Sequence, residues 1–181
     1  MVEPQRAQRT RRRSHRGAAR SLPRVGVICA IVAGCGQNPT EPNRLDAMGK
    51  VTVKSKDHSF EAWVADSDEE RQRGLMFVTA DQMRPTSEGH ERSMLFVFPR
   101  EQGPTAGFWM RNTQIPLDIA FIRSDGRIVR VHTMAPFDER SYAPGAPYRY
   151  ALEVNAGVFE RLEIKKGDMI EIPDSVMREA R

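Results

Sequence analysis

The sequence predicts a small, mainly β domain of the α+β class, in which one or two short helices accompany a sheet that is partly closed into a barrel or strongly bent. Two observations predict this class. Short apolar stretches recur along the chain with turn signals between them, which is typical of a β-rich domain. Helix signals are confined to two short segments. A closed or bent sheet is favoured because closure removes exposed strand edges.

The elements expected in the first half of the domain follow from residue alternation and from capping signals. Ser67 and Glu70 have the spacing of a capping box, and Gly74 is a stop signal, so a short helix should lie between them. The expected elements are strands at 51–56 and 60–65 with Asp57 and His58 in their turn, this helix, a loop at 79–92, a buried strand at 93–98 and a loop at 99–107.

The second half is expected to hold the remaining strands of the sheet. The segment "SDGR" at 124–127 predicts a tight hairpin turn between two apolar stretches. Asn155 is a candidate cap for a short helical turn. The expected elements are strands at 117–122, 128–134, 148–154 and 169–172, the helical turn after Asn155, and a charged tail that frays after Pro173.

The first 35 residues have the plan of an export signal. Positive charge ends at Arg24, and nine apolar residues follow at 25–33. That run is too short for a membrane-spanning helix, which needs about 20 apolar residues, but it suits the apolar region of a signal peptide. The run closes on "VAGC" at 32–35, which resembles the lipobox of bacterial lipoproteins. The resemblance implies that Cys35 carries two or three acyl chains, enough for stable membrane anchoring.

This plan divides the chain into four parts and predicts its location. A lipoprotein signal peptide is expected at 1–34, a lipidated flexible tether at 35–49, the β-rich domain at 50–173 and a tail at 174–181. The mature protein should be anchored to a membrane of the bacterial cell envelope and face the periplasm or the exterior.

The distribution of charge argues against a nucleic-acid partner. The chain has 28 basic and 24 acidic residues, of which eight Arg and one Glu fall within 1–34, so the rest of the chain keeps 20 and 23 and a net charge of −3. Nucleic-acid binding needs basic residues clustered on a folded face, and this part shows no such cluster. Cys29 leaves with the signal and Cys35 carries lipid, so no thiol remains for a disulfide, a nucleophile or a zinc site.

The stretch "GFWMRNTQIPLDIAFI" at 107–122 holds most of the candidate site residues. Asp118 lies on a mostly apolar strand, where a carboxylate must be paired, hydrogen-bonded or wet. In one interpretation Asp118 clamps the preceding turn to the strand, and its available partners are Arg71, Arg111, Asn112, Thr113 or backbone amides. In the other, the segment lines a ligand pocket. The ligand-binding candidates are Trp109, Arg111, Asn112, Thr113, Asp118, Glu153 and Asn155.

No familiar catalytic, metal or cofactor pattern accompanies these residues. The chain lacks the "GxSxG" elbow, a calcium-loop pattern and glycine-rich phosphate motifs. Three histidines follow the leader, at positions 58, 90 and 132, and none is spaced from another as metal ligands are. No cofactor is predicted, and Asp118 and Glu153 are the candidates for acid–base catalysis.

Six motifs together resemble one protein family. They are "EERQRGLM", "MLFVF", "FWMRNTQIPLDIAFI", "DGRIV", "YALEVNAG" and "IKKGD". In order and spacing they are similar to the domain of unknown function 192 family over residues 51–172. The resemblance implies a compact β-rich domain, often secreted or membrane-tethered in bacteria, and brings no reaction with it. The chain departs from the family pattern at Ser93, where glycine is usual, and in a longer loop at 84–92.

The sequence thus predicts an envelope-tethered lipoprotein domain that acts as a non-enzymatic binding or interaction module for a glycan, a peptide or a partner protein. The alternative is a hydrolase or transferase that acts on envelope material through a carboxylate whose pKa is raised by burial. A third possibility is a purely structural spacer.

Overall fold

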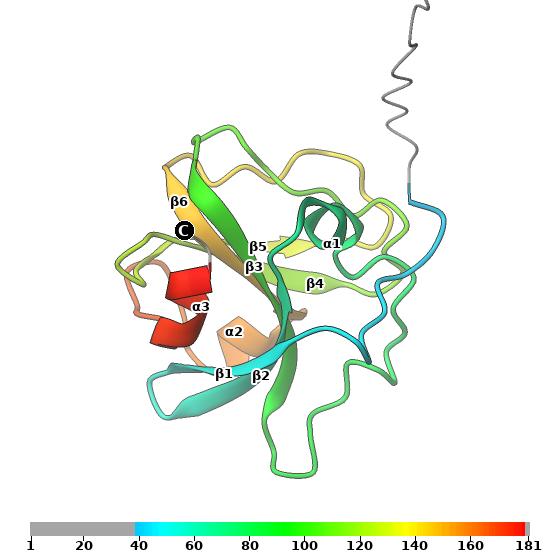
Figure 1. The fold of residues 1–181 in the computed structure, drawn as a ribbon, viewed down its shortest axis with the longest axis horizontal. Helices are drawn as coiled ribbons and strands as arrows, with labels where there is room; N and C mark the ends of the chain where they lie inside the picture. The colour runs from blue at the N-terminus through cyan, green and yellow to red at the C-terminus, as the bar shows by residue number, and fades with distance from the viewer. Residues whose placement is uncertain (1–38, 180–181) are drawn as a thin grey trace, which may run out of the picture. The chain divides into compact units, whose positions relative to one another are not determined.

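The computed structural model describes residues 39–179, so the predicted signal peptide and Cys35 lie outside the described part. The described chain forms one six-stranded sheet in the order β1-β2-β3-β6-β4-β5, accompanied by three short helices (Figure 1). The elements are β1 (Lys50–Ser55), β2 (His58–Ala65), α1 (Asp68–Arg73), β3 (Glu91–Gln102), β4 (Leu117–Ile122), β5 (Ile128–Met134), β6 (Tyr148–Asn155), α2 (Val158–Arg161) and α3 (Asp174–Glu179).

The sheet is mixed and open. β2 and β3 pair in parallel, and every other neighbouring pair of strands is antiparallel. A parallel pair needs a long crossover connection, which α1 and the loop after it provide. β1 and β5 are the two edges of the strand order, so the sheet is not closed into a barrel. The predicted β-rich α+β domain is confirmed, and its sheet is an open one.

Both faces of the sheet carry a hydrophobic core. All six positions of β4 are buried. Its side chains alternate between two clusters, with Leu117 and Ile119 in the first and Ala120 and Ile122 in the second. Alternation follows because successive side chains of a strand point to opposite faces. The first cluster lies on the face of Ile119, and the second lies on the face of Asp118.

The expected element boundaries needed correction at several places. β3 continues past Phe98 through Pro99 to Gln102, with a shift of register after Val97. A bulge accommodates a proline because the ladder hydrogen bond is already interrupted there. His58 belongs to β2 rather than to the turn. The expected strand at 169–172 makes isolated bridges to Lys54 and Arg127 instead, and 174–179 forms α3 instead of fraying.

The tether ends earlier than expected. Leu45 and Met48 are buried in the first cluster. The Asn43 side-chain amide donates to the backbone carbonyls of Glu70 and Gly74, at 3.0 and 2.9 Å. Residues 43–48 therefore pack on the domain, and they tie the start of the described chain to the end of α1.

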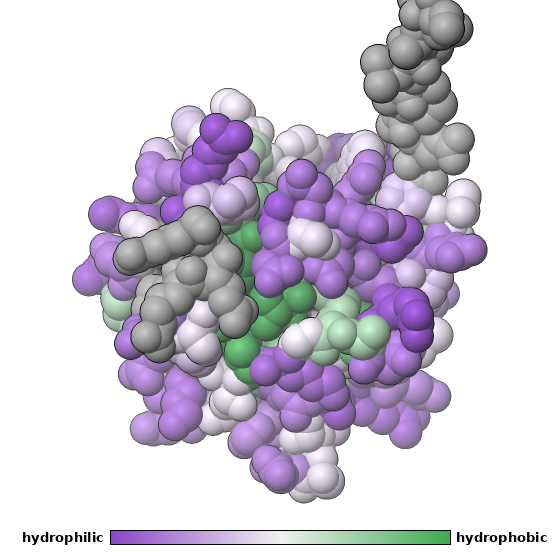
Figure 2. Space-filling view, in the orientation of Figure 1, coloured by the Kyte–Doolittle hydropathy of each residue, from purple (hydrophilic) through white to green (hydrophobic). Residues whose placement is uncertain are grey.

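The surface is mostly polar. In the view of Figure 2, hydrophilic residues cover most of the molecule, and a strip of hydrophobic residues shows in a hollow near the centre. Within residues 39–179, no helix has both the length and the apolar character needed to cross a membrane.

Candidate functional site

The segment 107–122, called the signature segment below, begins where its backbone passes close to the backbone of residues 141–142. Phe108 and Tyr142 form an isolated bridge. A Cβ atom at Gly107 would lie 2.4 Å from the Ser141 hydroxyl and 2.8 Å from the Tyr142 backbone, so a side chain there would collide with the crossing strand. The crossing positions Trp109 beside the first core, with 44% of the residue exposed.

The next residues form the predicted turn. The Thr113 amide donates to the Met110 carbonyl at 3.1 Å, and Asn112 has a φ of 54°. Asparagine tolerates this left-handed conformation better than most residues do. The Asn112 side chain donates to the Pro39 carbonyl at 3.3 Å, so the turn also contacts the first described residue of the chain.

Asp118 is buried and fully engaged by neutral donors. The Thr133 hydroxyl donates to one carboxylate oxygen at 2.7 Å. The backbone amides of Gly157 and Phe159 donate to the other oxygen, at 2.8 and 3.3 Å. The carboxylate thus joins β4, β5 and the start of α2. This arrangement favours a structural role for Asp118, and two of its partners are backbone amides, which were among those expected. The bonds hold β5 and α2 rather than the preceding turn, and no arginine takes part in them.

The same contacts correct the expected role of Asn155. The residue before α2 is Gly157, and no side chain of its own caps the helix. The amides that a cap would satisfy are bonded by Asp118, from a strand distant in sequence. Asn155 lies at the end of β6 instead, where its side chain donates to the Met83 carbonyl at 2.7 Å and holds the loop before β3.

Glu153 lies on the opposite face of the sheet from Asp118. In β6 it is paired with Ile119 of β4 and Met94 of β3, and directly paired residues share a face. Only 4% of the residue is exposed. Among the described residues, its carboxyl group makes no hydrogen bond or ion pair. Burial disfavours the charged form and raises the pKa of Glu153 to about 8.

Glu153 lines a cavity of about 370 Å³ in the first core, together with Trp109 and Thr113. This volume lies at the lower end of the usual range for small-molecule sites. Aromatic rings supply much of the wall, and they pack edge to face, with centroids 4.9 Å apart for Phe96 and Phe108. The aromatic lining residues are Phe96, Phe98, Phe108, Trp109 and Tyr148.

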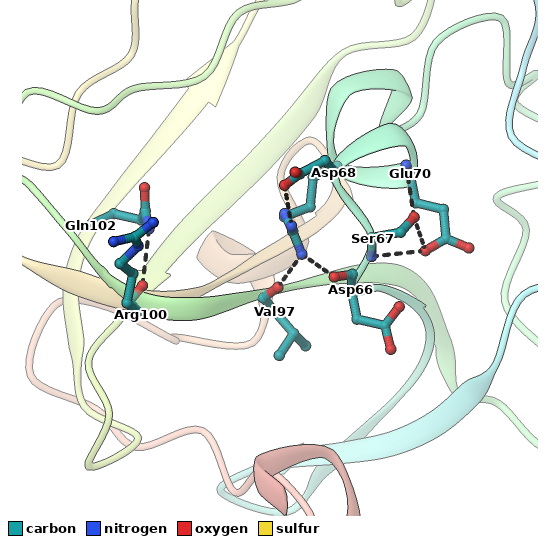
Figure 3. Close-up of polar contacts among 8 residues, drawn as sticks. Asp66, Ser67, Asp68, Glu70, Val97, Arg100 and Gln102 are labelled. Carbon is teal, nitrogen blue, oxygen red and sulfur yellow. Dashed lines mark hydrogen bonds and ion pairs between the residues drawn. The ribbon is translucent and has the colours of Figure 1, made fainter. Parts of the chain in front are cut away.

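Charged residues of α1 form one side of the cavity. The largely buried Arg71 guanidinium donates to the carbonyl oxygens of Asp66 and Val97 (Figure 3). It also pairs with the carboxylate of Asp68 and lies 5.5 Å from the centroid of the Phe98 ring. Ser67 and Glu70 complete the predicted capping box, which fixes the first turn of this helix. The Arg71 guanidinium is therefore held in place by acceptors other than Glu153.

Tyr148 closes another side of the cavity. Its hydroxyl group donates to the Ala106 carbonyl at 2.9 Å, and burial raises its pKa to about 12. The hydroxyl is therefore neutral at physiological pH. Its ring packs against Phe98 and Phe121, with centroids 5.5 and 4.9 Å away.

The structure brings together part of the predicted site. Trp109, Thr113 and Glu153 line the cavity, whereas the other four candidates do not. Arg111 lies over the Trp109 ring, 5.3 Å from its centroid, and is 3.7 Å from Glu139. Sequence reasoning missed the aromatic wall and the contribution of α1. Alternation in 93–98 carried a partial signal, because it places Phe96 and Phe98 on one face.

Metal ligands are not gathered at this site. Across 39–179, no group of three or more His, Cys, Asp or Glu residues is arranged to hold a metal ion.

Comparison with known proteins gives the chain relatives along most of the folded domain. Two archaeal proteins are similar to it: UPF0127 protein PF1050 of Pyrococcus furiosus is 29% identical over 122 residues, and UPF0127 protein PH1112 of Pyrococcus horikoshii is 33% identical over 125 residues. Each match covers 66% of this chain, with 92% of the first relative and 96% of the second.

A solved structure shows the same fold. The crystal structure of a protein of unknown function from Novosphingobium aromaticivorans matches with a TM-score of 0.62 and 32% identity, over 73% of this chain and 91% of that one. The model of the DUF192 family, described as "Uncharacterized ACR", matches residues 50–172. This chain therefore belongs to the DUF192 family.

Proposed function

We propose that the protein is a cell-envelope lipoprotein whose domain binds a small neutral ligand in the Glu153 cavity and catalyses no reaction. The observation that carries the proposal is the uncommitted Glu153 carboxyl group, buried at the wall of a cavity among aromatic rings. A buried polar group without a partner destabilises a fold by about 1–3 kcal/mol. A ligand that supplies the missing partner would remove that penalty.

The charge state of Glu153 selects the class of ligand. With a pKa of about 8, the carboxyl group is mostly protonated at neutral pH and can donate a hydrogen bond. A carbonyl or hydroxyl oxygen is its natural acceptor. Trp109 and Phe108 offer apolar surface to the rest of the molecule. An N-acetylated sugar or a short peptide from the envelope has both features.

Fluorescence titration tests this assignment, with Trp109 as the reporter. N-acetylglucosamine and N-acetylalanine amide are the probes, and glucose, which lacks the acetamide group, is the matched control. We expect one acetamide probe to change the emission and glucose to leave it unchanged. Glu153→Gln should keep binding because an amide N–H also donates, and Glu153→Leu should lose it. Equal responses of the Leu variant and the wild type would refute the role of Glu153.

A hydrolase or transferase is the second candidate, and the raised pKa of Glu153 favours it too. A buried carboxyl group that stays protonated near neutral pH is suited to general acid catalysis. Asp68 lines the same cavity and is the second carboxylate there. The Gln variant separates the two functions, because a binding module keeps its function in Glu153→Gln whereas an enzyme loses turnover while it still binds substrate.

The membrane attachment is supported by the segment 25–35, with its apolar run, small residues and Cys35. Cys35→Ala should move the protein from the membrane fraction to the soluble fraction, and [³H]palmitate labelling should disappear with it. Membrane retention of the Ala variant would refute the lipid anchor. The net charge of −3 after residue 34 supports a partner other than nucleic acid.

A further inference from the structure

We propose that an exposed aromatic surface, formed by Phe77, Trp109 and Phe137, docks on the bilayer to which Cys35 is anchored. This proposal rests on the lipid anchor of the proposed function, and the surface shares Trp109 with the lining of the ligand cavity. The three residues are among the few large hydrophobic residues that the described chain exposes, at 37%, 44% and 62%.

The three residues are carried by backbone segments that are bonded to one another. The Phe77 amide donates to the Asn112 carbonyl at 2.8 Å, and the Phe137 amide donates to the Thr113 carbonyl at 3.0 Å. Trp109 precedes the same turn in the chain. The turn of the signature segment thus lies between two loops, each of which presents a phenylalanine.

The backbone at both phenylalanines is strained, which argues that the rings serve a purpose outside the fold. Phe77 has a φ of 63° and Phe137 a φ of 59°. The left-handed region costs a residue with a bulky side chain about 1–2 kcal/mol, and glycine or asparagine would occupy it more easily. Phe137, with 62% of the residue exposed, recovers little of this energy by burial in the core. Strain of this kind is typical of functional surfaces.

The first described residue, Pro39, contacts the turn that lies between the two phenylalanine loops. The Asn112 side chain donates to the carbonyl of Pro39. The backbone carbonyls of Asn112 and Thr113 in the same turn accept from the amides of Phe77 and Phe137. Cys35 precedes Pro39 by four residues. Four extended residues span at most about 14 Å, so the acyl chains must enter the membrane close to the aromatic surface. A tether this short keeps the surface at high effective concentration at the bilayer.

The chemistry of the surface suits a lipid–water interface. Tryptophan and other aromatic residues prefer the depth of the headgroups, where an apolar ring and a polar fringe are both satisfied. Arg111 lies over the Trp109 ring, 5.3 Å from its centroid, and 3.7 Å from Glu139, so a cation and its counter-ion form the polar fringe of the ring.

The test uses the full lipidated chain, reconstituted in vesicles of phosphatidylethanolamine and phosphatidylglycerol that contain brominated lipid. Bromine quenches tryptophan at the interface, and a Trp109→Phe protein defines the background from the buried Trp63. We expect strong quenching of the wild type and quenching at background level in the Phe77→Asn, Phe137→Asn double variant. Asparagine suits the left-handed backbone, so this variant should melt no lower than the wild type. Met169→Asn, which removes an exposed apolar side chain elsewhere, should leave quenching unchanged.

The outcomes separate the anchor from the docking surface. Background quenching in the wild type, with Cys35→Ala still released from membranes, would overturn the docking and leave the lipoprotein assignment intact. Unchanged quenching in the double variant would equally refute the role of the two phenylalanines. Membrane retention of Cys35→Ala would remove the anchor and this proposal together.

Discussion

Glu153→Gln should make the domain more resistant to alkaline conditions. In the folded protein, Glu153 holds its proton up to about pH 8, whereas in the unfolded chain it releases it near the ordinary value of 4.5. The folded state therefore binds more protons between these values, and its stability falls as pH rises. The contribution of Glu153 is fully present below about pH 4.5 and is lost once the pH passes about 8. Glutamine has nearly the same shape and does not titrate.

The size of the effect follows from the shift of the pKa from 4.5 to about 8. Each unit of pKa difference corresponds to about 1.4 kcal/mol, so the complete effect is roughly 5 kcal/mol. Part of it has already been lost at pH 5. Between pH 5 and pH 8, the free energy of unfolding of the wild type should fall by about 3 kcal/mol more than that of the Gln variant.

Urea denaturation at pH 5, 6, 7 and 8, followed by far-ultraviolet circular dichroism, measures this difference. The two proteins should have similar stability at pH 5 and diverge steadily above it. Glu101→Gln is the matched control, because Glu101 is exposed and the same chemical change should leave the slope with pH unaltered. Parallel curves for the wild type and Glu153→Gln would refute the buried, protonated carboxyl group and, with it, the neutral hydrogen-bond donor of the proposed site.

Three further substitutions test the scaffold. Asp118→Asn should lower the free energy of unfolding by about 2 kcal/mol, because the amide NH2 group would face the Thr133 hydroxyl or the Gly157 amide, which are themselves donors. Urea denaturation measures this loss, and an unchanged midpoint would contradict the role of Asp118 as a structural clamp. Gly107→Ala should cost about 1–3 kcal/mol, because the new methyl group would overlap the crossing backbone, and a melting temperature equal to that of the wild type would show that the crossing is looser than described. Ser67→Ala should cost about 1 kcal/mol through loss of the cap of α1, which differential scanning calorimetry detects, whereas Ser67→Asp should retain most of the stability.

Local elements were predictable where a single signal acts over a few residues. The hairpin of β1 and β2, the capped helix α1 and the turn between β4 and β5 follow from alternation, a capping box and "SDGR", and all three are present. Errors came where a distant partner decides the outcome. β3 runs on through Pro99 because β6 continues beside it, and 169–172 stays out of the sheet with only isolated bridges.

The candidate site divides in the same way. The stretch at 107–122 predicted the turn that the structure forms at Met110–Thr113. It also identified Asp118 as a carboxylate that needs partners. Backbone amides were expected among those partners, but the sequence could not say which ones, and it did not suggest Thr133, because Thr133 and Gly157 are 15 and 39 residues away. The cap of α2 was assigned to Asn155 for the same reason, since sequence signals describe only caps that lie next to their helix.

By itself, the sequence determined the α+β class, the membership of a family and the contrast between a basic N-terminal segment and a net acidic remainder, because these depend on local pattern and composition. Only the tertiary structure decided the roles of the two buried carboxylates. Asp118 and Glu153 are alike in sequence terms, as acids within apolar strands. The register of β4 and β6 places them on opposite faces of the sheet, one among hydrogen-bond donors and the other at the wall of an aromatic cavity. Hydrogen bonds to the first support its interpretation as a structural clamp, and the absence of a partner for the second among residues 39–179 is the basis of the proposed ligand site.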